Sequence, residues 1–128
     1  MSELEKIVAT VDDLAEQWAI SPKLVMQLNL VLEELFTNIV FYGFDDGQTQ
    51  EHRISIVFSR TDGVLTIVVS DDAKPFNLLE QAHDPGVEKP LEERNIGGLG
   101  VHFVKTVMDH VEYARRDGKN IVTLTKKY

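Results

Sequence analysis

Residues 28–41 read L-N-L-V-L-E-E-L-F-T-N-I-V-F, and the rest of the domain is organised around this segment. Leu28, Leu32, Leu35 and Ile39 recur at intervals of three and four residues, which is the spacing of one face of an α-helix. The pattern therefore predicts a long amphipathic helix whose apolar face packs against the rest of the domain.

Two polar residues, Glu34 and Asn38, lie at the edge of this apolar face. They are four residues apart, so their side chains are stacked on successive helical turns. Asparagine is unfavourable inside a helix because its side chain competes for backbone hydrogen bonds. A carboxylate beside an amide oxygen suits a magnesium ion or a water to be deprotonated. A solvated glutamate next to an asparagine at the core edge is the structural alternative.

The composition indicates one soluble domain spanning residues 1–128. Its net charge of −8 argues against general binding to nucleic acid or to anionic membranes. The chain contains no cysteine, so disulfides and thiolate chemistry are excluded. The absence of cysteine is compatible with a cytoplasmic location. No apolar run reaches the length of about 20 residues that spans a membrane, and the first residues do not resemble a secretory signal.

The order of predicted elements indicates an α+β fold. Ser21 followed by Pro22 is a typical start of a helix. The hydrophobic patterns predict helices over residues 3–19, 22–42 and 101–108, and strands over residues 53–60, 64–70, 111–116 and 121–126. The strands form two hairpins, so we expect a two-layer sandwich with helices on one face of a mostly antiparallel sheet.

Two further segments have residues suited to ligand binding. The sequence D71-D-A-K-P-F-N77 leaves a predicted strand at a loop, where ligand-binding side chains are common, although it also fits a plain acidic turn. The sequence G97-G-L-G100 opens a helix, and its backbone N–H groups would form a cradle for phosphate. Between these segments lies a long connection without periodicity, which is typical of lids, binding loops or disorder.

Together, E34-L-F-T-N38, D71-D-A-K-P-F76 and G97-G-L-G100 resemble the ordered motifs of the GHKL ATPase superfamily, which has the Bergerat ATP-binding fold. Within it, the sequence is most similar to bacterial anti-sigma-factor serine kinases of the partner-switching type. The resemblance covers roughly residues 21–126 and places the ATP lid at about residues 77–98. It implies that the cofactors are ATP and Mg2+.

The resemblance also assigns roles to individual residues. Glu34 would be the general base that takes a proton from the incoming hydroxyl, and Asn38 would bind the magnesium ion. Asp71 would accept a hydrogen bond from the adenine amino group. The remaining positions implied to contact the nucleotide are Ala73, Phe76, Arg94, Gly97, Gly98, Leu99, Gly100, Val101 and Thr123, with Arg94 adding positive charge near the γ-phosphate.

Ala73 departs from the family pattern, which usually has glycine two residues after the adenine-binding aspartate. If the backbone there needs a positive φ or lies flat against adenine, a Cβ would cost about 1 kcal/mol. The departure affects the expected ATP affinity rather than the fold.

The resemblance implies a cytoplasmic, homodimeric protein-serine kinase that phosphorylates a STAS-type antagonist and sequesters a sigma factor. Two alternatives remain. The first is the catalytic domain of a histidine kinase, which needs a phosphoacceptor histidine, and residues 1–20 contain none. The second is a nucleotide-gated binding module without turnover.

Overall fold

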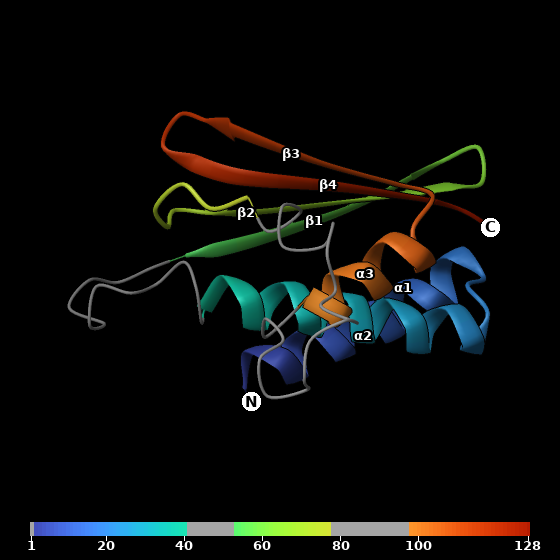
Figure 1. Ribbon diagram of the computed structural model, residues 1–128. Coiled ribbons are helices and arrows are strands. Elements are labelled where there is room, and N and C mark those ends of the chain that lie inside the picture. Colours follow the sequence, from blue (N-terminus) through green and yellow to red (C-terminus); the bar gives the residue numbers. More distant parts are fainter. Residues whose placement is uncertain (1, 41–52, 78–97) are drawn as a thin grey trace.

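The computed structural model describes residues 2–40, 53–77 and 98–128. Helices lie in one layer and strands in the other, so the predicted α+β sandwich is confirmed (Figure 1). In chain order the elements are α1 (Glu3–Trp18), α2 (Pro22–Asn38), β1 (Ile54–Thr61), β2 (Val64–Asp71), α3 (Gly98–Val107), β3 (His110–Arg116) and β4 (Lys119–Lys127).

Local sequence sets the starts of the first two helices. The Ser2 side chain accepts a hydrogen bond from the Glu5 N–H and forms a capping box at α1. Ser21 accepts from the Leu24 N–H at the start of α2, with proline in the first turn as predicted. The helix α2 ends at Asn38, and the predicted end near Tyr42 lies outside the described residues.

The four described strands form an antiparallel sheet in the order β1-β2-β4-β3. Each hairpin turns at an Asp-Gly pair with two positive φ angles, 51° and 76° in both turns, which is the pattern of a type I′ turn. The second turn is shorter than predicted, because β4 begins at Lys119 rather than at residue 121. The β2–β4 pairing places Asp71 opposite Asn120.

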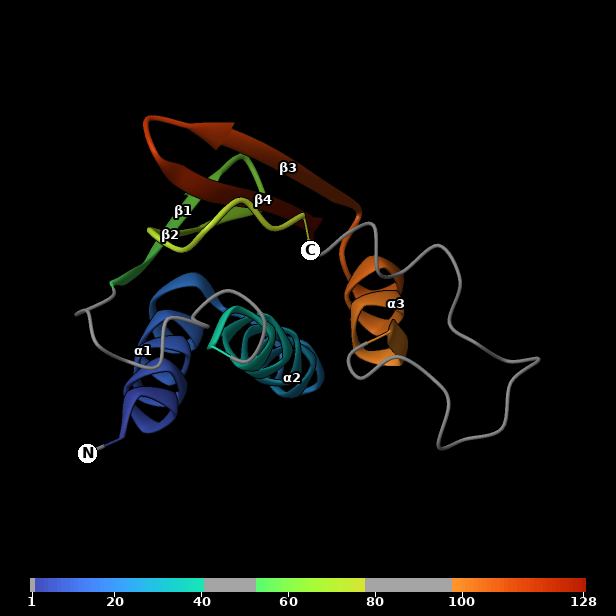
Figure 2. The ribbon, with the colours of Figure 1, turned by 60° about the vertical axis from the view of Figure 1, so that its left-hand side comes forward.

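The helix α2 lies between α1 and α3, beneath the sheet (Figure 2). All four apolar positions predicted for its inner face, Leu28, Leu32, Leu35 and Ile39, are buried. They pack in one core with the inward-facing residues of the two central strands, Leu65, Ile67, Val69, Val122 and Leu124. The C-terminal half of α2 is thereby fixed below the sheet.

The helix α3 begins three residues earlier than predicted. Gly98, Leu99 and Gly100 form its first turn instead of a preceding glycine turn. Gly100 does not have a positive φ, so it follows the helical path. Among the described helices, none combines the length and the apolar character needed to cross a membrane.

Candidate functional site

Glu34 and Asn38 form a hydrogen-bonded pair on α2. Asn38 Nδ2 donates to the Glu34 backbone carbonyl at 2.9 Å and to Glu34 Oε1 at 2.8 Å. The Asn38 side chain is only 4% exposed, so these bonds explain how an asparagine is tolerated inside the helix. Because the amide nitrogen is used, Asn38 presents its oxygen, Oδ1, as an acceptor beside a carboxylate.

The first turn of α3 lies directly against this pair. A Cβ placed on Gly100 would lie 1.9 Å from Glu34 Cδ and 2.0 Å from Glu34 Oε1. Only glycine therefore fits here with the carboxylate in its present position. The first N–H groups of a helix lack intrahelical partners and favour negative charge, so the start of α3 suits phosphate or carboxylate oxygens.

Asp71, the last residue of β2, has a buried carboxylate, and only one of its two oxygens is hydrogen-bonded to the described part of the chain. Its side chain is 5% exposed. Asp71 Oδ1 accepts hydrogen bonds from the Ala73 N–H and from Asn120 Nδ2, both at 3.0 Å. Oδ2 has no hydrogen bond to the described part of the chain, so Asp71 can accept one more donor, such as the amino group of a base.

Asn120 on β4 is a site residue that the sequence analysis missed. It donates to Asp71 and to the Lys74 carbonyl, and it accepts from the Phe76 N–H and the Tyr113 hydroxyl. In the sequence, Asn120 reads as the last residue of the turn before the predicted strand at residues 121–126, a common place for asparagine, so its residue type carries no signal of this role. Only the strand register identifies its partner, Asp71.

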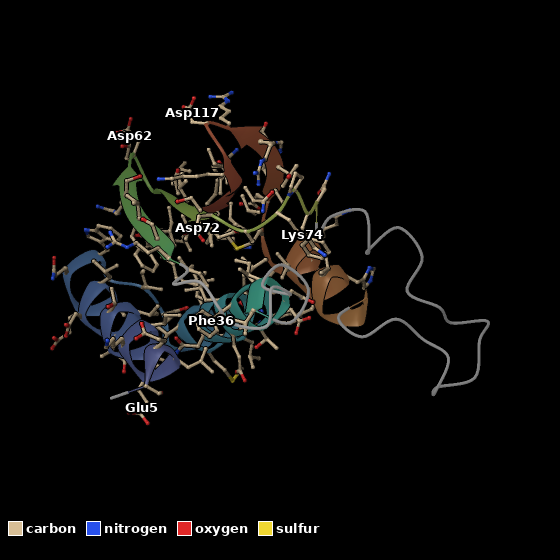
Figure 3. The ribbon with its side chains drawn as sticks, turned by 90° about the vertical axis from the view of Figure 1, so that its left-hand side faces the viewer. Glu5, Phe36, Asp62, Asp72, Lys74 and Asp117 are labelled. Atoms are coloured by element: carbon tan, nitrogen blue, oxygen red, sulfur yellow. The ribbon has the colours of Figure 1, made fainter. Side chains whose placement is uncertain are left out.

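The two groups of polar residues lie toward the same end of the molecule. The exit of β2 and the C-terminal end of α2 are both on the left in Figure 1. Figure 3 looks at the molecule from that side and shows Lys74, from the segment after β2, above α2 and beside α3. Asp71 thus lies in the sheet layer and the Glu34–Asn38 pair in the helix layer, both toward this end of the molecule.

Comparison with known proteins gives the family. Residues 1–126 match the model of the histidine kinase-like ATPase domain. The chain belongs to this family. The sequence resemblance to the GHKL superfamily and to its anti-sigma serine kinases is confirmed.

Two curated relatives of this ATPase domain are named protein kinases. The chain is 29% identical over 112 residues to the serine/threonine-protein kinase BtrW of Bordetella bronchiseptica, covering 88% of this chain and 75% of BtrW. It is 25% identical over 120 residues to the serine-protein kinase RsbW of Halalkalibacterium halodurans, covering 91% of this chain and 71% of that protein.

Solved structures support the fold of the ATPase domain. The blue-light activated histidine kinase of Erythrobacter litoralis matches 84% of this chain with a TM-score of 0.61 at 20% identity. The histidine kinase AdeS of Acinetobacter baumannii matches 80% with a TM-score of 0.53 at 16% identity. The chain spans 31% and 46% of these two proteins, and the likeness concerns the fold alone.

Other residues predicted to contact nucleotide in the ATPase domain have different placements. Val101 is 0% exposed and belongs to the hydrophobic core, so only its backbone is available. Thr123 alternates with the inward residues of β4 and pairs with Val68, so it lies on the sheet face opposite the helices and away from Asp71. Phe76 packs against the core, and its N–H donates to Asn120.

Ala73 does not have the strained backbone that would require glycine. Among the described non-glycine residues, positive φ angles occur at Ala19, Asp62 and Asp117 but not at Ala73. The side chain of Ala73 is 2% exposed, and its N–H donates to Asp71. Of the remaining predicted positions, Leu99 lies in the first turn of α3, and Arg94 and Gly97 lie outside the described residues.

The site has few metal ligands of its own. Across residues 2–40, 53–77 and 98–128, no three His, Cys, Asp or Glu side chains gather in a way that could hold a metal ion. Magnesium is usually held by one or two protein oxygens together with waters and substrate phosphates. Asn38 Oδ1 has no hydrogen bond to the described part of the chain, and its place beside the Glu34 carboxylate fits that pattern.

The polar site does not coincide with a groove of about 680 Å³ that lies between α1, α2 and β1. This groove is lined in part by Ile7, Phe36 and Phe58. None of its lining residues is Glu34, Asp71 or Gly100. We assign the candidate site by its polar chemistry, because groove size alone says nothing about phosphate or metal binding.

Proposed function

We propose that this protein is an ATP-dependent protein-serine kinase that also acts as an anti-sigma regulatory factor. The family match and the names of the relatives BtrW and RsbW support the kinase class. The single observation that carries the proposal is the contact of the Glu34–Asn38 pair with the first turn of α3. Through this contact, the carboxylate that would act as the base and the amide oxygen that would bind the metal lie beside the N–H groups that would bind phosphate.

Phosphoryl transfer requires mainly positioning and charge neutralisation. When bound, magnesium-ATP would supply the phosphoryl group, and its metal ion would supply positive charge beside the phosphates. Asn38 would hold the metal through Oδ1, and the first N–H groups of α3 would bind phosphate oxygens. Glu34 Oε1 accepts from Asn38, whereas Oε2 has no hydrogen bond within the described residues. Oε2 is therefore the atom that would take the proton of the substrate serine.

Asp71 would bind the base of the nucleotide. Its Oδ1 is held by two donors from the protein, and its Oδ2 would accept a hydrogen bond from the adenine amino group. Such a carboxylate would discriminate strongly between nucleotide bases. A nucleotide base without a hydrogen-bond donor at that place would leave the buried Oδ2 unpaired.

Transfer of phosphate tests the proposed function directly. The purified protein would be incubated with γ-labelled ATP, magnesium and a STAS-domain protein from the same cell. We expect label on a serine of the STAS-domain protein, and far slower labelling with the Glu34→Gln variant. Labelling of a histidine would support the histidine kinase alternative, whereas nucleotide binding without any transfer would support the binding module.

We further propose that the protein is a cytoplasmic homodimer that binds a sigma factor in a nucleotide-dependent way. This part rests on the sequence resemblance to partner-switching kinases. Co-purification from the native cell in the presence of ADP or ATP tests whether the protein binds a sigma factor. Sedimentation as a monomer at micromolar concentration would contradict the dimer.

A further inference from the structure

The side chain of Asn120 uses its entire hydrogen-bonding capacity within the protein. It is 3% exposed. Nδ2 donates to Asp71 Oδ1 at 3.0 Å and to the Lys74 carbonyl at 2.8 Å. Oδ1 accepts from the Phe76 N–H at 3.1 Å and from the Tyr113 hydroxyl at 2.5 Å. An amide offers two donors and two acceptor sites, so none of its groups remains for a ligand.

These bonds fix the segment that follows β2. Residues 72–77 lie outside regular strands, and Asn120 bonds to the backbone of this segment at two points, Lys74 and Phe76. Arg115 adds a third tie, because its guanidinium donates to the Ala73 carbonyl at 2.7 Å. The hairpin of β3 and β4 therefore holds the segment that contains the residues following Asp71.

The same bonds determine the orientation of the Asp71 carboxylate. Oδ1 receives two donors, from Asn120 and from Ala73, and this fixes the rotation of the carboxylate group. Oδ2 is thereby left in one position. Without Asn120 the carboxylate would keep only the local Ala73 bond and could turn either oxygen toward it.

We propose that Asn120 is a positioning residue for base recognition, and that Tyr113 assists it by donating to its amide oxygen. Asn120 acts through Asp71 and does not contact the nucleotide. It fixes Asp71 Oδ2 so that the site selects purines with an exocyclic amino group at C6 over purines with a carbonyl there. The inference rests on the proposed nucleotide site and adds the origin of its base selectivity.

The test compares magnesium-ATP with magnesium-ITP, whose base has a carbonyl in place of the amino group. Calorimetry on the wild-type protein should show tighter binding of ATP. Asn120→Ala should weaken ATP binding by about tenfold and change ITP binding by less than about threefold, since a hydrogen bond to a charged group is lost only with ATP. A general structural defect would weaken both nucleotides equally.

A double-mutant cycle separates action through Asp71 from direct action. In an Asp71→Asn background, Asn120→Ala should leave the ATP-to-ITP affinity ratio unchanged. Tyr113→Phe keeps the ring and removes one donor, so it should lower the ratio by about threefold. The matched control is Thr125→Val, an isosteric change on the outward face of the same strand, which should not alter the ratio.

The outcomes distinguish this inference from the proposed function. A wild-type ATP preference that persists in Asn120→Ala would overturn the positioning role and leave the kinase proposal standing. Wild-type protein that binds neither nucleotide would overturn both. If thermal unfolding shows that Asn120→Ala does not fold, an unchanged ratio in Tyr113→Phe overturns the inference, and a lowered ratio supports it.

Discussion

The two halves of the candidate site are built in different ways. The Glu34–Asn38 pair lies within one helix, and its bonds span four residues. The network of Asp71 and Asn120 joins residues 49 apart in the chain and needs three strands in register. The polar groups of the helix come together through local sequence spacing, whereas the carboxylate of Asp71 is oriented by tertiary contacts within the sheet.

This difference predicts different responses to mutation. A change in the helical pair should alter metal binding or transfer while the fold remains, because the backbone of α2 is held by its buried apolar face. A change in the sheet network should alter selectivity and stability together, since buried polar groups lose partners. Variants in each half therefore test whether the helical pair and the sheet network respond differently.

The largest effect is expected from Asn38→Ala, which removes the proposed metal ligand. We expect magnesium-dependent ATP binding to be abolished, as measured by calorimetry with and without magnesium. The loss of its hydrogen bonds should lower the free energy of unfolding by only about 1 kcal/mol. Unchanged ATP affinity in a folded variant would exclude Asn38 from the site.

Glu34→Gln should have the next largest effect, and it should act on transfer alone. Glutamine keeps an oxygen that can accept from Asn38 but cannot take a proton at neutral pH. Single-turnover transfer to the STAS-domain substrate should fall by about 100-fold or more, with ATP affinity nearly unchanged. Transfer at the wild-type rate would show that another group is the base.

The sequence predicted the local half well. The apolar stripe of α2, the serine caps and the two Asp-Gly turns each depend on residues close together in the chain, and the four strands lie within two residues of their predicted bounds. The Glu34–Asn38 contact was predicted for the same reason, because residues four apart in a helix must be neighbours.

The Asp71–Asn120 network could not be predicted, because the sequence of neither β2 nor β4 determines the register between them. Both strands have apolar residues at alternate positions, and shifting the pairing by two residues would preserve that pattern while separating Asp71 from Asn120. The role of Gly100 was also missed. A glycine is needed at this position because the Glu34 carboxylate occupies the space of a Cβ. This requirement depends on how α3 packs on α2.

Gly100→Ala tests whether the helical pair depends on its neighbour. The new methyl group would displace the end of a flexible side chain, so the fold should remain, and alanine favours the helix. Moving the Glu34 carboxylate should lower transfer on the order of tenfold. In the Glu34→Gln background the same change should have little further effect on transfer, and an additive loss would place the defect elsewhere.

The smallest effect is expected from Ala73→Gly, which restores the residue usual in the family. Since Ala73 has no positive φ and its methyl group is buried, glycine brings no relief of strain and removes apolar packing. The free energy of unfolding, measured by urea denaturation, should fall by about 1 kcal/mol. ATP affinity should be unchanged, because Ala73 acts through its N–H, which glycine retains. Tighter ATP binding in this variant would instead place the Ala73 methyl group against the base, and the sheet half of the site would then restrict the nucleotide by shape as well as by hydrogen bonding.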